Sequence, residues 1–171
     1  MRKSRQVHPL QIRSPIPAAA LPAAAALWWG GVGPGWPRQV PEVRASHGIV
    51  ALDARGEVQG VAGLRDGAGG FPAHVPLLAR LAFRAAPATA DLVIDGIVVR
   101  EPGQGVGRLL IEAAGGHARA GGHPGLRVEV AARNHTACAF YRRLGFAEIG
   151  RGRYGWPWSG EVLLLRRPEG A

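Results

Sequence analysis

Two short segments of this chain carry residue types whose spacing suits chemistry. The first is the stretch 103–107 (Gly-Gln-Gly-Val-Gly), which follows an apolar run and precedes a helical pattern. Backbone N–H groups in such a turn can approach an anion closely, and the start of a helix adds positive potential. The second segment, 134–146, places Tyr141 on a predicted helix. Together they predict a site that holds a phosphate-bearing ligand and moves a proton.

The glycine stretch does not match the common nucleotide-binding patterns. A dinucleotide fingerprint requires a third glycine that is missing here, and a Walker A loop requires a lysine next to the loop. The only lysine in the chain is Lys3. Taken alone, the glycines are equally compatible with a plain turn from strand to helix.

Together the two segments resemble the GCN5-related N-acetyltransferase (GNAT) family. The family's helix pattern N-x-x-A-x-x-[FL]-Y-x-x-[LF]-G-F is complete over 134–146, and Gly105 and Gly107 match the glycines of its R/Q-x-x-G-x-G/A loop. Pro102 stands at the R/Q position, and the loop 99–103 is shorter than in typical members. One donor to the pyrophosphate is therefore expected to be missing.

The resemblance implies transfer of an acetyl group from acetyl-CoA to an amine, by direct attack in a ternary complex and without a metal. The glycine loop would bind the pyrophosphate, the end of the preceding strand would pair with the pantetheine arm, and Tyr141 would protonate the leaving thiolate. The implied acetyl-CoA-binding residues are Ile97, Val98, Val99, Gly103, Gly105, Val106, Gly107, Arg108, Asn134 and Tyr141.

Two carboxylates are candidates for the general base that accepts the amine proton. Asp95 lies in the apolar run, and Glu129 lies on the strand predicted next to it. Asp95 can equally be a polar residue at a strand edge, and a chain of waters can replace either carboxylate.

The acceptor is expected to be a small-molecule or peptide amine. The resembled family places its acceptor between the first helix and the last hairpin, and four of the five tryptophans fall in these two regions. They either line the acceptor pocket or cap a thin core. These four residues are Trp28, Trp29, Trp156 and Trp158.

Composition limits the other classes of function. With 171 residues and 47% hydrophobic residues, the chain has enough apolar material for one folded domain. The net charge of +9 would attract a polyanion, but the arginines are not clustered with aromatic residues, so nucleic-acid binding is the weaker alternative. A single cysteine suits a reducing compartment, and we predict a cytoplasmic protein. Prolines interrupt the uncharged stretch 14–37, so no membrane span is expected.

The composition of the N-terminal region is also similar to that of a secretory signal, because a basic start precedes the alanine-rich stretch 18–27. The resemblance instead makes 7–13 and 18–29 the first strand and helix of the family. We therefore expect a flexible basic start over 1–6, a single N-acetyltransferase domain over 7–167 and a tail over 168–171.

Hydrophobic periodicity and turn residues predict an α/β fold. The resemblance implies a mixed, mostly antiparallel sheet that is flanked by helices and splayed between its fourth and fifth strands, 91–99 and 126–130. The near-continuous apolar run over 91–99 predicts burial on both faces. Predicted strands cover 7–13, 48–52, 58–64, 91–99, 126–130, 146–149 and 161–165, and predicted helices cover 18–29, 75–84, 105–120 and 134–144. Glycines 30 and 31 are expected to stop the first helix.

Three alternatives stay open at this stage. The altered loop at Pro102 suits a catalytically degenerate protein that binds acyl-CoA as a sensor or partner module. His135 and Cys138 lie on one helix face, but no further ligand pair supports a metal site. The oligomeric state is undetermined, and a homodimer is one option.

Overall fold

The computed structural model describes residues 9–33, 39–74 and 83–170, and the fold is given for these residues. One eight-stranded sheet organises them, in the order β1-β2-β3-β5-β6-β8-β7 with β4 beside β3. Within it only β5 and β6 run parallel. The predicted mixed, mostly antiparallel sheet is confirmed. Its strands are β1 (Gln11–Arg13), β2 (Gly48–Leu52), β3 (Val58–Asp66), β4 (Gly69–Gly70), β5 (Leu92–Val99), β6 (Gly125–Ala131), β7 (Ala147–Gly152) and β8 (Val162–Pro168).

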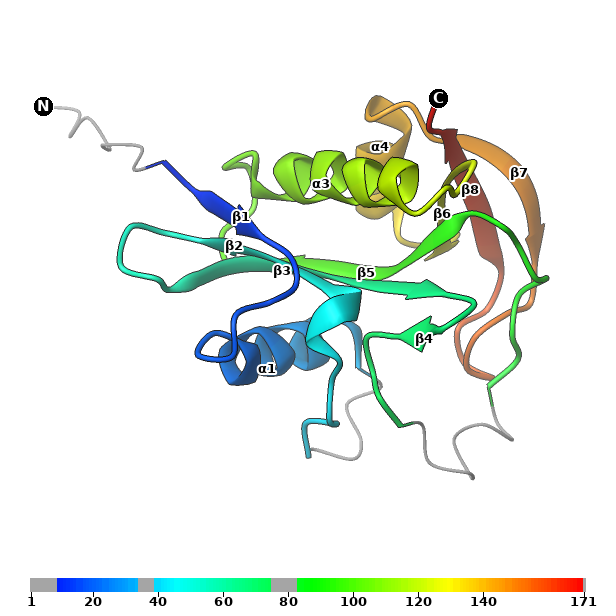
Figure 1. Ribbon diagram of the computed structural model, residues 1–171. Helices are drawn as coiled ribbons and strands as arrows, with labels where there is room; N and C mark the ends of the chain where they lie inside the picture. Colours follow the sequence, from blue (N-terminus) through cyan, green and yellow to red (C-terminus); the bar gives the residue numbers. More distant parts are fainter. Residues whose placement is uncertain (1–8, 34–38, 75–82, 171) are drawn as a thin grey trace, which may run out of the picture.

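Helices cover both faces of the sheet (Figure 1). The helices α3 (Val106–Ala120) and α4 (His135–Arg143) lie on one face, and α1 (Leu21–Val32) lies on the other. A short 3-10 helix, η1 (Ala45–His47), leads into β2. Each face has its own apolar core, one beneath α3 and α4 and one beneath α1. The molecule is therefore a sandwich of helix, sheet and helix.

The parallel strands β5 and β6 stay together only at their starts. Three residue pairs join them, the last being Ile94 with Val128. Both strands continue beyond that pair, β5 along β3 and β6 along β8. A parallel pair that ends while both strands go on opens into a fork, which confirms the predicted splay. Asp95 is an extra residue in β5, because Gly96 pairs with Gly63 and Ile94 pairs with Leu64.

The fork also corrects one prediction. The run 91–99 was expected to be buried on both faces, but only the first three residues of β5 are buried and its last five are half-buried. The apolar pattern cannot reveal this difference, because it depends on where the neighbouring strand β6 turns away.

The predicted end of the first helix is wrong as well. Residues 30 and 31 do not stop α1, which continues to Val32. A side chain at Gly31 would begin only 2.5 Å from Val98, so the glycine lets the helix lie close to β5. This packing offsets the low helix propensity of glycine.

The predicted helix 75–84 lies largely outside the described residues. Its last residue, Arg84, pairs with Gly155 as an isolated bridge. The other predicted elements all occur, with ends that shift by a few residues. No helix in the described part of the chain combines the length and hydropathy that crossing a membrane requires.

Candidate active site

The glycine stretch forms the turn between β5 and α3. Gly103 and Gly105 have φ values of 81° and 78°, in the left-handed region that favours glycine. Gly105 is the N-cap residue of α3, and no side chain caps this helix. The N–H groups of the first turn have no acceptor inside the helix. Those at 106–108 are therefore available to an anion.

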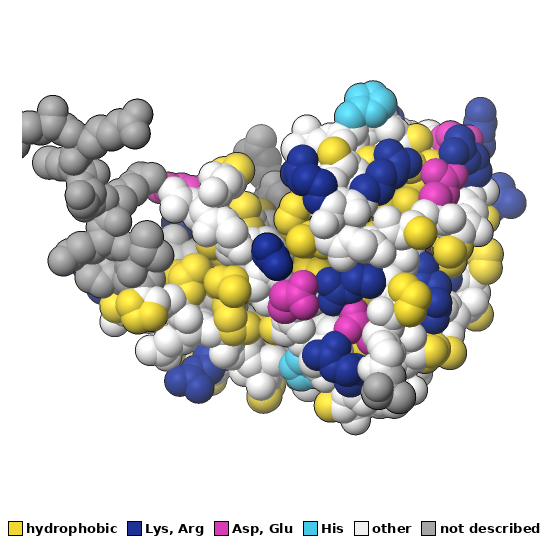
Figure 2. Space-filling view, turned by 90° about the horizontal axis from the view of Figure 1, so that it is seen from above, with side chains coloured by type: hydrophobic (Ala, Val, Ile, Leu, Met, Phe, Trp, Pro, Cys, Tyr) yellow, Lys and Arg dark blue, Asp and Glu magenta, His cyan; other side chains and the backbone are white. Residues whose placement is uncertain are grey.

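The surface around this turn is basic. Figure 2 looks onto the face that α3 and α4 cover, and arginine side chains gather there. The exposed arginines of these two helices are Arg108, Arg119, Arg142 and Arg143. A positive surface raises the local concentration of an anionic nucleotide.

Helix α4 packs against the first turn of α3. A side chain at Gly107 would begin 3.1 Å from the ring of Phe140, so the two helices approach closely here. Asn134 caps α4 by accepting the N–H of Ala137 at 3.1 Å, a position at which asparagine is strongly preferred. Its proposed contact with acetyl-CoA stays a prediction.

Tyr141, on α4, is 7% exposed. Its ring packs between those of Phe140 and Phe146, with centroids 5.1 and 5.4 Å away. Burial raises the pKa of the Tyr141 hydroxyl well above its ordinary value of 10.0. The group therefore stays protonated at neutral pH and can act as a proton donor. A role in packing alone would use the same ring contacts.

The end of β5 offers an open backbone edge. Residues 97–99 pair with β3 on one side and have no β6 partner on the other. Backbone groups at such an edge can bind an extended ligand as a further strand would. The predicted pantetheine-binding residues Ile97, Val98 and Val99 thus lie at the fork, directly before the glycine turn.

Both predicted base candidates also stand at the fork. Asp95 and Glu129 are the first residues beyond the last pair that joins β5 to β6. Arg65, on β3, bridges them: its Nε donates to Asp95 at 2.9 Å, and one terminal nitrogen donates to Glu129 at 3.2 Å. The structure thus brings the two carboxylates together and pairs both of them with Arg65.

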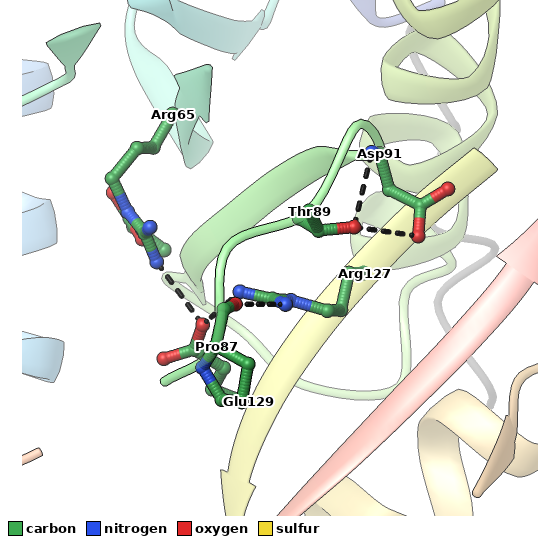
Figure 3. Close-up of polar contacts among 7 residues, drawn as sticks. Arg65, Pro87, Thr89, Asp91, Arg127 and Glu129 are labelled. Atoms are coloured by element: carbon green, nitrogen blue, oxygen red, sulfur yellow. Dashed lines mark hydrogen bonds and ion pairs between the residues drawn. The ribbon is translucent and has the colours of Figure 1, made fainter. Parts of the chain in front are cut away.

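A second arginine holds Glu129 from the other side. Arg127 donates to the Glu129 carboxylate at 2.9 Å and to the carbonyl of Pro87 at 2.6 Å (Figure 3). Its side chain is 3% exposed, and its Nε has no acceptor within the described residues. Arg127 is thus a fixed part of the framework.

Burial raises the pKa of Asp95 above its ordinary value, and this effect outweighs the opposing attraction of Arg65. A carboxylate with a raised pKa is a stronger base, which suits Asp95 for taking a proton from an amine.

Sequence reasoning missed both arginines. Their signal was present, since Arg127 interrupts the predicted apolar strand 126–130 and Arg65 directly follows the predicted strand 58–64. Register explains their proximity: Arg65 pairs with Val93, and Val93 pairs with Arg127. These three residues therefore share the face of the sheet that α3 does not cover.

The four tryptophans form two separate groups. Trp28 is 5% exposed, packs on Phe71 and donates its indole N–H to the Gly96 carbonyl at 3.3 Å, so it belongs to the core beneath α1. Trp29 stacks on Trp28. Within the described part of the chain, no ring contact joins this pair to the tryptophans of the hairpin.

The hairpin tryptophans are more accessible. Trp156 and Trp158 stack with centroids 5.3 Å apart and planes 3° apart, and Trp158 is 58% exposed. Phe83 packs edge-on against Trp156 at 5.5 Å. The chain from Phe83 to Pro87 connects this aromatic cluster with Arg127, and four residues of chain span at most about 14 Å.

His135 and Cys138 lie in different surroundings, although they are three residues apart on α4. His135 is exposed, and Cys138 is buried near the Ala131 carbonyl. Across 9–33, 39–74 and 83–170, no group of three or more His, Cys, Asp or Glu side chains is arranged to hold a metal ion.

Comparison with protein families gives a match to the acetyltransferase (GNAT) family over residues 22–146. Curated protein sequences give no match.

Several solved structures share the fold. Nourseothricin acetyltransferase is 26% identical with a TM-score of 0.53, over 72% of this chain and 65% of that enzyme. This chain thus spans just under two thirds of that enzyme's length. A GCN5-related N-acetyltransferase from Kribbella flavida is 21% identical with a TM-score of 0.60, over 93% of this chain and 97% of its own. The putative acetyltransferase yncA from Salmonella typhimurium, solved with acetyl-CoA, is 15% identical with a TM-score of 0.62, over 94% of each chain.

Proposed function

The chain belongs to the acetyltransferase (GNAT) family, and we propose that it transfers an acetyl group from acetyl-CoA to an amine. The observation that carries this proposal is the uncapped first turn of α3 directly after the open edge of β5. The uncapped first turn of α3 suits a pyrophosphate, and the open edge of β5 suits an extended pantetheine arm. They follow each other along the chain in the order of the pantetheine arm and the pyrophosphate.

The residues present fit acetyl-CoA. Backbone N–H groups at 106–108 would hold the pyrophosphate, with Gly103 and Gly105 shaping the turn. The edge of β5 at 97–99 would hold the pantetheine arm and polarise the thioester carbonyl. Acetyl-CoA supplies the activated acetyl group, and the protein supplies orientation and proton transfer.

Two side chains are proposed to move protons. Asp95 would take a proton from the amine as the new C–N bond forms, with Glu129 as the alternative base. Tyr141 would give a proton to the thiolate as the C–S bond breaks. The raised pKa of Asp95 makes it a better proton acceptor, and Tyr141 carries its proton at neutral pH, both at its ordinary pKa of 10.0 and at the raised pKa.

The acceptor is proposed to be a small-molecule or peptide amine that approaches from the hairpin side of the fork. Trp156 and Trp158 are exposed enough to contact it, and Phe83 would extend the same wall. The buried indole of Trp28 fits a core role better. Among the fold relatives, one is named a nourseothricin acetyltransferase and another a ribosomal-protein-S18-alanine N-acetyltransferase, so the fold accommodates small and protein acceptors.

A second candidate is a protein that binds acyl-CoA without turnover. Pro102 favours it, because proline has no N–H and stands where the family pattern has a hydrogen-bonding side chain. The proposed location of either form is the cytoplasm, since one cysteine suits a reducing compartment.

Calorimetric titration with CoA, followed by a thiol-release assay with acetyl-CoA and a panel of amines, tests both candidates. Binding with amine-dependent thiol release supports the transferase. Binding without release by any amine supports the sensor. Absence of CoA binding would contradict both.

A further inference from the structure

Two carboxylates at the fork share one accessible cation. We propose that the guanidinium of Arg65 occupies the position of the acceptor's ammonium group, and that acceptors are alkyl amines which displace it. This inference rests on the proposed function, because it places the acceptor at the same fork. It makes Arg65 a specificity-determining residue.

The geometry defines a cation site. Asp95 and Glu129 come from two strands that separate at this point, and both accept from the Arg65 guanidinium, at 2.9 and 3.2 Å. Their side chains are 20% and 16% exposed, so water screens them only partly. A cation between them is held from two sides, and either carboxylate alone would hold it less well.

Of the two arginines in this cluster, only Arg65 can leave. Its side chain is 40% exposed, whereas that of Arg127 is 3% exposed and tied to the Pro87 carbonyl. The long, flexible Arg65 side chain starts from β3, on the far side of β5 from Glu129, and reaches across to it (Figure 3). It can therefore swing into solvent without disturbing the sheet.

Charge balance indicates the class of acceptor. Among the residues that the structure describes, the cluster holds two carboxylates and two guanidinium groups, whose charges balance. When the Arg65 guanidinium leaves, one negative charge remains unbalanced, and a single alkylammonium ion restores neutrality. An amine with a carboxylate next to it would bring that carboxylate towards Asp95 and Glu129, which repel it. The site thus favours simple primary amines over zwitterionic amino acids.

Binding of butylammonium, with β-alanine as the zwitterionic comparison, tests this inference without requiring turnover. Calorimetry is performed on protein saturated with CoA. In Arg65→Gln the internal competitor is gone, so butylammonium should bind about threefold to tenfold more tightly than in the wild type, while β-alanine should gain no affinity. Arg65→Met, which keeps most of the side-chain length, is the second variant if Arg65→Gln does not fold.

Arg166→Gln is the matched control. Arg166 lies on the same face in the same register row, and it pairs with Asp91 instead of with the fork. The Arg166→Gln variant should bind butylammonium and β-alanine with the affinities of the wild type. Unchanged butylammonium affinity in both Arg65 variants would overturn the inference. Weaker β-alanine binding in those variants would also overturn it, since Arg65 would then be a carboxylate anchor.

The proposed acetyltransferase function can be contradicted independently of the role inferred for Arg65. If CoA does not bind, the transferase is contradicted, and the same amine titrations on the protein without CoA still decide the role of Arg65.

Discussion

The two sides of the fork are built from different parts of the chain. The proposed acetyl-CoA side uses backbone groups of one continuous segment, 97–108. The proposed acceptor side uses charged side chains that β3, β5 and β6 bring together from positions 65, 95, 127 and 129. A backbone site depends on local conformation and is visible as a local pattern. A site made of side chains depends on the register between strands, and it is not visible as a local pattern.

The two faces of the same four strands show a similar contrast. Leu64, Ile94, Val128 and Leu165 form one row across the sheet, beneath α3. The adjacent row, on the opposite face, consists of Arg65, Val93, Arg127 and Arg166. Arg127 and Arg166 lie directly opposite each other on neighbouring strands, an arrangement that is destabilising for like charges, and each of the three arginines has a carboxylate partner. The stability of this face therefore depends on its ion pairs, whereas that of the opposite face depends on apolar packing.

Loss of the Tyr141 hydroxyl should have the largest effect. In Tyr141→Phe, kcat should fall about 10²–10⁴-fold while CoA affinity stays unchanged, because the hydroxyl is proposed to act only as the thiolate leaves. Thiol release and calorimetry measure the two quantities. A folded variant with wild-type kcat would leave Tyr141 as a packing residue.

The tryptophans of the two regions should respond in opposite ways. Trp28→Ala removes a buried ring and should lower the free energy of unfolding by about 3–5 kcal/mol. The double variant Trp156→Ala, Trp158→Ala should change stability much less, since Trp158 is largely exposed.

The same double variant should raise KM for aromatic amines about threefold to tenfold and leave KM for acetyl-CoA unchanged. Denaturant unfolding and steady-state kinetics separate these outcomes. Identical KM values for every acceptor before and after the change would remove the hairpin from the acceptor site.

Two glycines with matched conformations allow a controlled test of the proposed acetyl-CoA loop. Gly105 and Gly56 have φ values of 78° and 79°, and an added Cβ at either meets no atom within 4 Å. Alanine should therefore cost each site about 1–2 kcal/mol of stability. Only Gly105→Ala should also weaken CoA binding, by about tenfold or more, as the turn shifts away from the anion.

Gly105 is the better position for this test than Gly107. A side chain at Gly107 would press on Phe140 and disturb α4 as well. Calorimetry with CoA on Gly105→Ala and Gly56→Ala gives the comparison, and equal CoA affinity in the two variants would exclude the loop from the site.

The smallest expected effect is a pH dependence at Tyr141. The folded state raises the pKa of this group above 10.0, so it favours the neutral phenol. The resulting stability is fully present below about pH 10 and is lost as pH rises through the folded-state pKa. The stability of the wild type relative to Tyr141→Phe should therefore decline above about pH 10. Denaturant unfolding at several alkaline pH values measures it, and a constant difference would argue against a buried phenol.

Much of the fold was predictable from local patterns. The Asn134 cap, the Gly56 turn and the order of strands and helices all follow from preferences that act over a few residues. The positions of Asp95 and Glu129 on neighbouring strands were also predictable. Their shared partner Arg65 was not, because it lies 30 residues from Asp95 and 64 residues from Glu129 in the chain.

The sequence by itself determined the family, the glycine turn before α3 and the tyrosine on α4, because each is encoded in contiguous residues. The tertiary structure decided which charges meet at the fork, that Trp28 is core while Trp158 is surface, and where β5 loses its neighbour β6. These features depend on strand register and on the separation of two strands. A shift of register by one residue would move Arg65 to the other face of the sheet, and no local pattern fixes that choice.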